Sequence, residues 1–203
     1  YYLYIHFLWI FLFIFEKKYI IFSRGVIMSY FFIFLFTFFI ATRKDIIYNN
    51  ITGVSTIPEY HFLVMIYTII CAIFFAYQTY RHFHYLYHYP LYIPFLIVLA
   101  TLSMCIGSIC PYTNTPTWLS SIHVYASMSA SILFILLLQI YTHELSLQFP
   151  NVYLQTHWIF HVGLQVLVLL FLVSGAITGM IEILYVFFIC LYLYAIDRQM
   201  KKK

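Results

Sequence analysis

The chain has 203 residues, of which 65% are hydrophobic and only 8% are charged, and its net charge is +4. Soluble domains contain about 45–50% apolar and about 25% charged residues, so this composition excludes an ordinary water-soluble domain. The small positive charge lies at the chain ends and between apolar runs, which argues against a nucleic-acid partner. Residues 82–197 contain no Lys or Arg and only three acids, Glu144, Glu182 and Asp197. A stretch this poor in charge is expected to face lipid.

The first hydrophobic segment, residues 1–25, is set apart from the main domain. The chain starts at Tyr1, and Met28 is the first internal methionine that could open a membrane segment. The stretch is therefore a seventh hydrophobic segment, a processed leader or an over-extended reading frame. It is a poor secretory signal, because its charged residues at 16–18 follow the apolar run instead of preceding it.

The remaining residues, 26–200, form a single domain with six apolar segments. A helix needs about 20 apolar residues to cross a bilayer, and its backbone must be hydrogen-bonded internally there. We therefore expect an all-α, polytopic transmembrane helical bundle. The predicted spans are 26–42, 62–80, 91–110, 120–141, 157–175 and 181–197. A polar loop at 43–61, a basic aromatic turn at 81–90 and an amphipathic loop at 142–156 are among the predicted connections.

The cations predict how this bundle is oriented. Lys and Arg are concentrated in the cytoplasmic loops of membrane proteins. With both ends of the six-span bundle in the cytoplasm, only Arg43 and Lys44 of the ten Lys and Arg residues fall outside. We therefore expect a multi-pass membrane protein with a cytoplasmic C-terminus. The identity of the membrane does not follow from the sequence.

Three ionisable residues share the predicted outer face, namely Glu59, His123 and Glu182, and Asn50 lies with them. Ionisable groups in or near spans are costly unless paired, so they are the first functional candidates. Two carboxylates and an imidazole can do acid–base work or bind a cation or a polar headgroup. The alternative is an interhelical hydrogen-bond set that fixes the register of the bundle. Glu182 is the strongest candidate, because it lies in a nearly continuous apolar hairpin.

A second, histidine-rich set lies on the predicted inner face: His82, His84, His88, His143, His157 and His161. The pairs His84/His88 and His157/His161 have i, i+4 spacing, which lets two imidazoles on one helix face share a metal. A haem would need histidines on facing helices at one depth, which only this inner set offers. The alternative for residues 81–85 is an interfacial belt of aromatic and cationic side chains. We expect no cofactor, with zinc as the alternative.

The segment from His157 to His161 resembles the HxxxH motif of the CREST superfamily, a group of intramembrane zinc hydrolases. The resemblance implies a metal-dependent intramembrane hydrolase in which His157 and His161 bind zinc. In that superfamily an earlier helix supplies an SxxxH motif and an Asp. This chain has no SxxxH motif, and no predicted span carries an Asp in its interior.

The order of the outer features forms another pattern. The first loop carries Thr52-Gly53 and Pro58-Glu59, His123 opens the fourth span, Glu182 heads the sixth and Asp197 closes it. This order resembles the DRAM family, the damage-regulated autophagy modulators, whose relatives are implicated in GPI-anchor lipid remodelling. The resemblance implies six spans with both termini cytoplasmic and points to the same outer residues. It does not imply a reaction.

The sequence thus favours an integral membrane protein of DRAM-like type that is non-enzymatic and interacts with lipid. Its outer polar residues are expected to contact the headgroup of a membrane lipid. Two alternatives stay open: the metal-dependent hydrolase, and a structural subunit of a larger membrane complex with protein partners.

Overall fold

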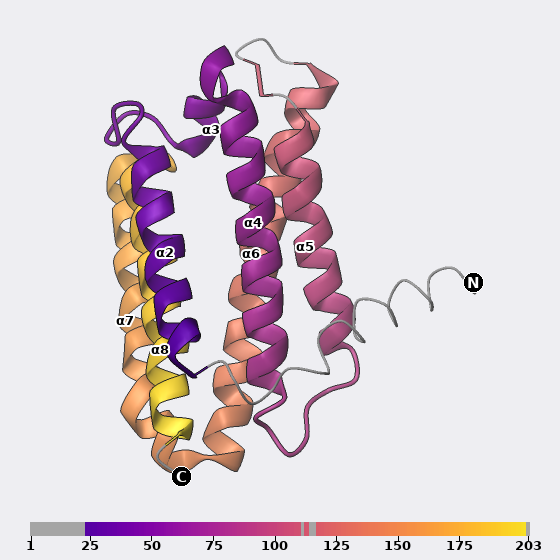
Figure 1. Ribbon diagram of the computed structural model, residues 1–203, viewed down its shortest axis with the longest axis vertical. Helices are drawn as coiled ribbons and strands as arrows, with labels where there is room; N and C mark the ends of the chain where they lie inside the picture. Colours follow the sequence, from indigo (N-terminus) through magenta and orange to yellow (C-terminus); the bar gives the residue numbers. More distant parts are fainter. Residues whose placement is uncertain (1–22, 111, 114–116, 202–203) are drawn as a thin grey trace, which may run out of the picture.

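The computed structural model describes residues 23–110, 112–113 and 117–201, so the predicted N-terminal hydrophobic segment lies outside them up to residue 22. The described residues form helices without any strand, which confirms the all-α prediction (Figure 1). The helices are α2 (Ser23–Ala41), α3 (Ile51–Ser55), α4 (Pro58–Phe83), α5 (Ile93–Ile109), α6 (Trp118–Gln148), α7 (Pro150–Ser174) and α8 (Gly179–Met200).

Four helices, α4, α6, α7 and α8, are long and apolar enough to cross a membrane. Two shorter apolar helices, Met28–Ala41 within α2 and Ile93–Ile109, lie where the first and third spans are predicted. Only 22–44% of the most apolar stretch of each long helix is buried inside the protein. Water would cover such outward apolar surface poorly, whereas lipid would cover it well. The described chain therefore has the make-up of a multi-pass helical membrane protein.

The predicted loop at 142–156 is wrong, because this stretch is helical. Helix α6 continues to Gln148 and α7 begins at Pro150, so only Phe149 separates them. Phe149 is buried, as are Leu145 before it and Val152 after it. These apolar side chains pack into the core and fix both helix ends there. The polar residues between them give the stretch the amphipathic pattern from which a loop is predicted. Pro150 at the first helical position favours a new helix start there.

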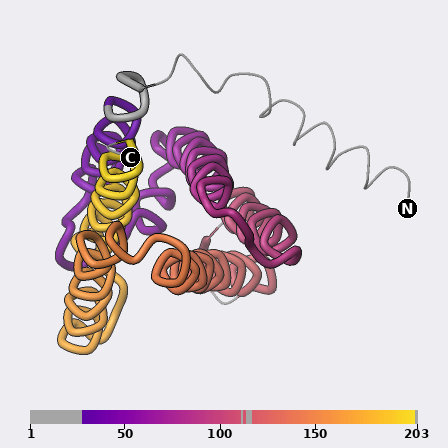
Figure 2. Tube along the Cα trace, turned by 90° about the horizontal axis from the view of Figure 1, so that it is seen from below, coloured from indigo at the N-terminus to yellow at the C-terminus, as the bar shows by residue number. Residues whose placement is uncertain are grey.

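The six longer helices of the described chain form two groups of three (Figure 2). Helices α2, α8 and α7 lie in one row with α8 in the middle, and α4, α5 and α6 form the other group. The C-terminal hairpin therefore returns to pack beside α2. One end of the bundle carries α3, and we call it the α3 end; the opposite end carries the C-terminus (Figure 1).

The loop before α3 is bound to the start of α8. The N–H of Gly179 donates to the carbonyl of Asn49 at 2.7 Å, and the N–H of Met180 donates to the carbonyl of Ile46 at 3.0 Å. These bonds satisfy two of the N–H groups that a helix start leaves without partners. A Cβ atom on residue 179 would lie 3.0 Å from the Asn49 oxygen, so this approach favours glycine. The α8 start thereby fixes the position of α3.

Gly163 lets α7 approach α8 closely, since a Cβ atom at this position would lie 2.8 Å from Cγ of Phe188. We expect Gly163→Leu to lower the free energy of unfolding by about 1–3 kcal/mol, the usual cost of overpacking. Thermal unfolding of the detergent-purified protein measures this loss. Val162→Leu is the matched control, because Val162 is 45% exposed and faces outward. Equal unfolding temperatures for the two variants would contradict the close packing.

Candidate functional site

A cavity of about 190 Å³ lies among α3, α4, α5, α6 and α8. One water molecule needs only about 10–15 Å³ on the same measure, so the space can hold a much larger occupant. The residues that line the cavity come from both helix groups, since α8 belongs to one and α4, α5 and α6 to the other. The cavity is therefore part of the interface between the two groups.

The cavity extends along most of α4. Its lining on this helix begins at His61, near the α3 end, and continues to Thr79. At 1.5 Å per residue, this stretch is about 27 Å long. The hydrocarbon core of a bilayer is about 30 Å thick, so the length of this lining is close to the thickness of that core.

The lining changes character along its length. The polar side chains at the α3 end include Thr52, Ser55, His61, Ser108, His123 and Glu182. Further along, the lining is mainly apolar, with Val64, Cys71, Ala72, Phe75, Ala76, Ile97, Ala100, Ala130, Phe134 and Leu137. Thr79 marks the far end, and its hydroxyl is buried without a hydrogen-bond partner among the described residues. The cavity is therefore amphipathic, with one polar end and a mainly apolar body that also includes the hydroxyl residues Thr68, Thr101, Ser127 and Ser131.

Glu182 reaches the polar end of the cavity from the first turn of α8. Its Oε2 accepts a hydrogen bond of 2.6 Å from the backbone N–H of Ile51. The other carboxylate oxygen, Oε1, has no protein partner among the residues that the structure describes. The carboxylate thus holds α3 in place with one oxygen and leaves the other available.

His123 also contacts α3, from the first turns of α6. Its Nδ1 is 2.9 Å from the carbonyl oxygen of Cys110, and its Nε2 is 3.2 Å from Oγ1 of Thr52. Because a carbonyl oxygen only accepts hydrogen bonds, Nδ1 carries the hydrogen. In the neutral ring, Nε2 then accepts from the Thr52 hydroxyl. His123 and Glu182 thus contact consecutive residues of α3.

The structure brings two of the four predicted outer residues together. His123 and Glu182 line the cavity, whereas Asn50 and Glu59 do not. Asn50 caps α3, where its Oδ1 accepts from the N–H of Gly53 at 2.7 Å. Glu59 is exposed in the first turn of α4, where a solvated carboxylate complements the positive end of the helix dipole. The expected convergence therefore includes His123 and Glu182 and leaves Glu59 apart.

The histidine pairs are placed differently from each other. Helix α4 ends at Phe83, so the prediction that His84 and His88 share a helix face is wrong. His157 and His161 do share α7, with ring centroids 6.1 Å apart. In the part of the chain that the structure describes, no three His, Cys, Asp or Glu side chains are grouped for a metal. The zinc alternative stays a prediction without a third ligand to support it.

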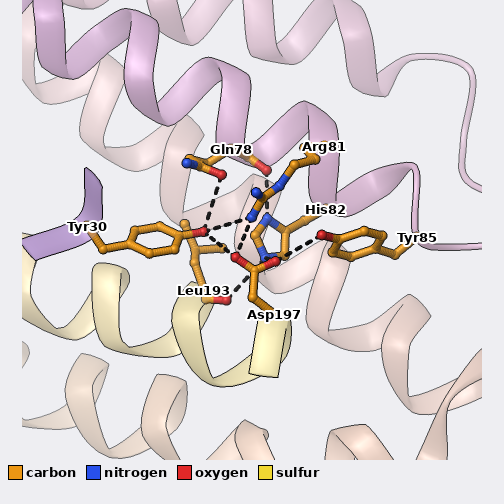
Figure 3. Close-up of polar contacts among 7 residues, drawn as sticks. All are labelled: Tyr30, Gln78, Arg81, His82, Tyr85, Leu193 and Asp197. Atoms are coloured by element: carbon orange, nitrogen blue, oxygen red, sulfur yellow. Dashed lines mark hydrogen bonds and ion pairs between the residues drawn. The ribbon is translucent and has the colours of Figure 1, made fainter. Parts of the chain in front are cut away.

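Figure 3 shows a second polar cluster, which the sequence did not reveal. It lies near the opposite end of the bundle, in the last turns of α4 and α8. A guanidinium nitrogen of Arg81, on α4, forms an ion pair with Oδ2 of Asp197, on α8. The hydroxyl of Tyr30 donates to the same carboxylate oxygen at 3.0 Å, and that of Tyr85 donates to Oδ1 at 3.0 Å. Arg81 is only 8% exposed and Asp197 only 3%. We call these residues, with Gln78 and His82, the Asp197 cluster.

His82 also belongs to this cluster rather than to an interfacial belt. Its Nδ1 is 2.7 Å from the carbonyl oxygen of Gln78, and its Nε2 is 3.2 Å from that of Leu193. The belt predicted for residues 81–85 is therefore wrong for Arg81 and His82, which are both buried. One signal could have revealed the cluster: Arg81 directly precedes the cation-free stretch, Asp197 is its last residue, and both share the predicted inner face.

Comparison of the chain with protein-family models, with curated proteins and with solved structures gives no match.

The Asp197 cluster predicts a stability loss when its charges are unbalanced. Asp197→Asn keeps the shape of the side chain but leaves the buried Arg81 charge without its counter-ion. Breaking a buried ion pair in this way costs about 3–5 kcal/mol, so we expect a clear fall in the unfolding temperature of the purified protein. Arg198→Ala, an exposed neighbour, is the control.

A double variant separates charge from packing. Arg81→Met combined with Asp197→Asn should be more stable than the sum of the two single losses, because it leaves no unpaired buried charge. Strictly additive losses would show that the two side chains do not act as a pair.

Proposed function

We propose that this chain is an integral membrane protein that binds one membrane lipid in the cavity. The headgroup lies at the polar α3 end, near Glu182 and His123, and an acyl chain extends along the apolar body toward Thr79. The single observation that carries the proposal is the amphipathic lining, polar at one end and apolar over most of about 27 Å along α4. The proposed role is binding, and no residue is assigned a catalytic step.

The apolar body favours a hydrocarbon occupant over water. Cavities lined by apolar side chains stay dry and bind apolar molecules, because water gains too few hydrogen bonds inside them. An empty cavity is costly as well, since its lining forgoes van der Waals contacts. In a bilayer, the acyl chains of lipids surround the helices and are available to enter. A lipid therefore matches both the polar end and the apolar body.

We further propose that α2 and α5 also cross the membrane, which completes six spans. Helix α2 has 19 residues and α5 has 17, both within the range of about 17–25 that spanning helices use. Each packs beside a longer apolar helix, α2 beside α8 and α5 beside α6. The distribution of cations favours a cytoplasmic Asp197 end. Membership of the DRAM family stays a proposal supported by the order of the motifs.

The orientation is tested with single cysteines at the two ends. Tyr48 is 83% exposed at the α3 end, and Lys201 follows α8. In intact cells, we expect Tyr48→Cys to react with a membrane-impermeant maleimide and Lys201→Cys to react only after permeabilisation. The unsubstituted chain, with its four native cysteines, gives the background. The reverse pattern would invert the topology.

Lipid binding is tested by filling the cavity. Ala130 lines it from α6, so we expect Ala130→Phe to weaken binding about tenfold, equivalent to about 1.4 kcal/mol. The measurement is crosslinking by a phospholipid with a photoreactive acyl chain, followed by mapping of the labelled peptides. Ile132→Phe adds a ring on the same helix at a position that is 55% exposed.

The two variants separate the cavity from the outer surface. We expect label on cavity-lining peptides of α4 and α6, lost in Ala130→Phe and retained in Ile132→Phe. Label that is confined to outward-facing positions, or equal in both variants, would contradict the proposed site.

A further inference from the structure

The polar end of the cavity contains a carboxylate but no cation. Among the described residues that line the cavity, none is Lys or Arg. The two cations of the α3 end have other contacts: Nζ of Lys44 donates to the carbonyl of Gly53 at 3.1 Å, and the guanidinium of Arg43 lies 3.7 Å from the ring centroid of Phe39. A phosphate at this site would meet the Glu182 carboxylate without a compensating charge.

Several hydroxyls of the lining already donate their hydrogens within the protein, whereas the hydroxyl of Thr79 at the far end has no partner among the described residues. The hydroxyl of Ser55 donates to the carbonyl of Thr52, that of Thr68 to Val64 and that of Ser108 to Cys105. Thr101, Ser131 and Tyr185 likewise donate to backbone carbonyls. Each of these groups can therefore offer the cavity only the lone pairs of its oxygen.

The imidazoles at this end follow the same rule. Nδ1 of His61 lies 3.2 Å from the carbonyl oxygen of Ser55, so it carries the hydrogen. The Nε2 atom of a neutral His61 is then an acceptor. Because the Thr52 hydroxyl donates to His123, Thr52 too is left with lone pairs only. Together with Oε1 of Glu182, the polar end presents acceptors from three separate helices.

We infer that the cavity selects lipids whose headgroup donates hydrogen bonds, an inference that rests on the proposed lipid site. The shared chemistry is an O–H or N–H group, which a free hydroxyl or a primary ammonium supplies. A quaternary ammonium or a bare phosphate does not supply it. Buried acceptors that stay unpaired cost about 1–3 kcal/mol each, so a headgroup without donors is disfavoured. Glu182, with its available oxygen Oε1, is the central acceptor.

The test compares lipids that share acyl chains and differ in donors, with binding measured by native mass spectrometry of the purified protein. One series is dioleoyl phosphatidylethanolamine, its N,N-dimethyl derivative and phosphatidylcholine, which lose N–H groups stepwise while the nitrogen keeps its charge. The other compares dioleoylglycerol with its O-methyl ether. We expect affinity to fall about tenfold across at least one series.

The two series identify the source of the donor. A fall in affinity across the first series identifies an ammonium as the donor. A fall in affinity across the second series identifies a hydroxyl. Equal affinities throughout both series, or tighter binding of dioleoyl phosphatidic acid, would overturn the inference while leaving the lipid site intact. Failure of every lipid to bind would overturn the proposed function together with the inference.

Glu182→Gln tests the residue itself. The amide oxygen can still accept from Ile51, so α3 keeps its position, while the NH₂ group replaces the available acceptor with a donor. We expect an unchanged unfolding temperature and continued lipid binding, with the affinity ratio between the donor-bearing and methylated lipids reduced toward one.

The matched control is Glu59→Gln, which changes an exposed carboxylate of the same end outside the lining. It should retain the ratio of the unsubstituted protein. An unchanged ratio in a stable Glu182→Gln variant would show that Glu182 only holds α3, and the inference would fail.

Discussion

The ion pair between Arg81 and Asp197 ties the two helix groups together near one end. Arg81 belongs to α4 and Asp197 to α8, so a single contact joins two elements far apart in sequence. Two tyrosine hydroxyls complete the hydrogen bonding of the carboxylate. Among the described residues, this is the only ion pair between Lys or Arg and an acid, so the two charges have no competing partners of this kind. The interaction thereby sets which face of α8 is turned toward α4.

The cavity follows from how the groups are joined at the other end. There, α8 contacts α3 through the carboxylate of Glu182, and it contacts the loop before α3 through the backbone N–H groups of Gly179 and Met180. The short helix α3 therefore bridges the two groups, and a space is left between them along α4. Polar groups that fix α3 also form the polar end of this space. The same residues thus serve the fold and the proposed binding of a lipid headgroup.

Much of this arrangement could be predicted from hydrophobicity, because lipid requires long apolar helices with satisfied backbones. His123 and Glu182 stood out because ionisable groups near spans are costly. The sequence could not place His61 or Thr52 in the cavity, because helices that are apolar all round have no stripe from which to predict their rotation. The position of Thr52 depends on the α3 bridge, which in turn depends on backbone hydrogen bonds to α8. The pairing of Arg81 with Asp197 needed that same three-dimensional information.

The most direct measurement is an experimental density map of the protein in lipid nanodiscs. The account predicts an elongated density between α4 and α8, with its wider end within hydrogen-bonding distance of Glu182 and Thr52 and its tail directed toward Thr79. A cavity closed by contact between α4 and α8, or one holding only separate water densities, would contradict it.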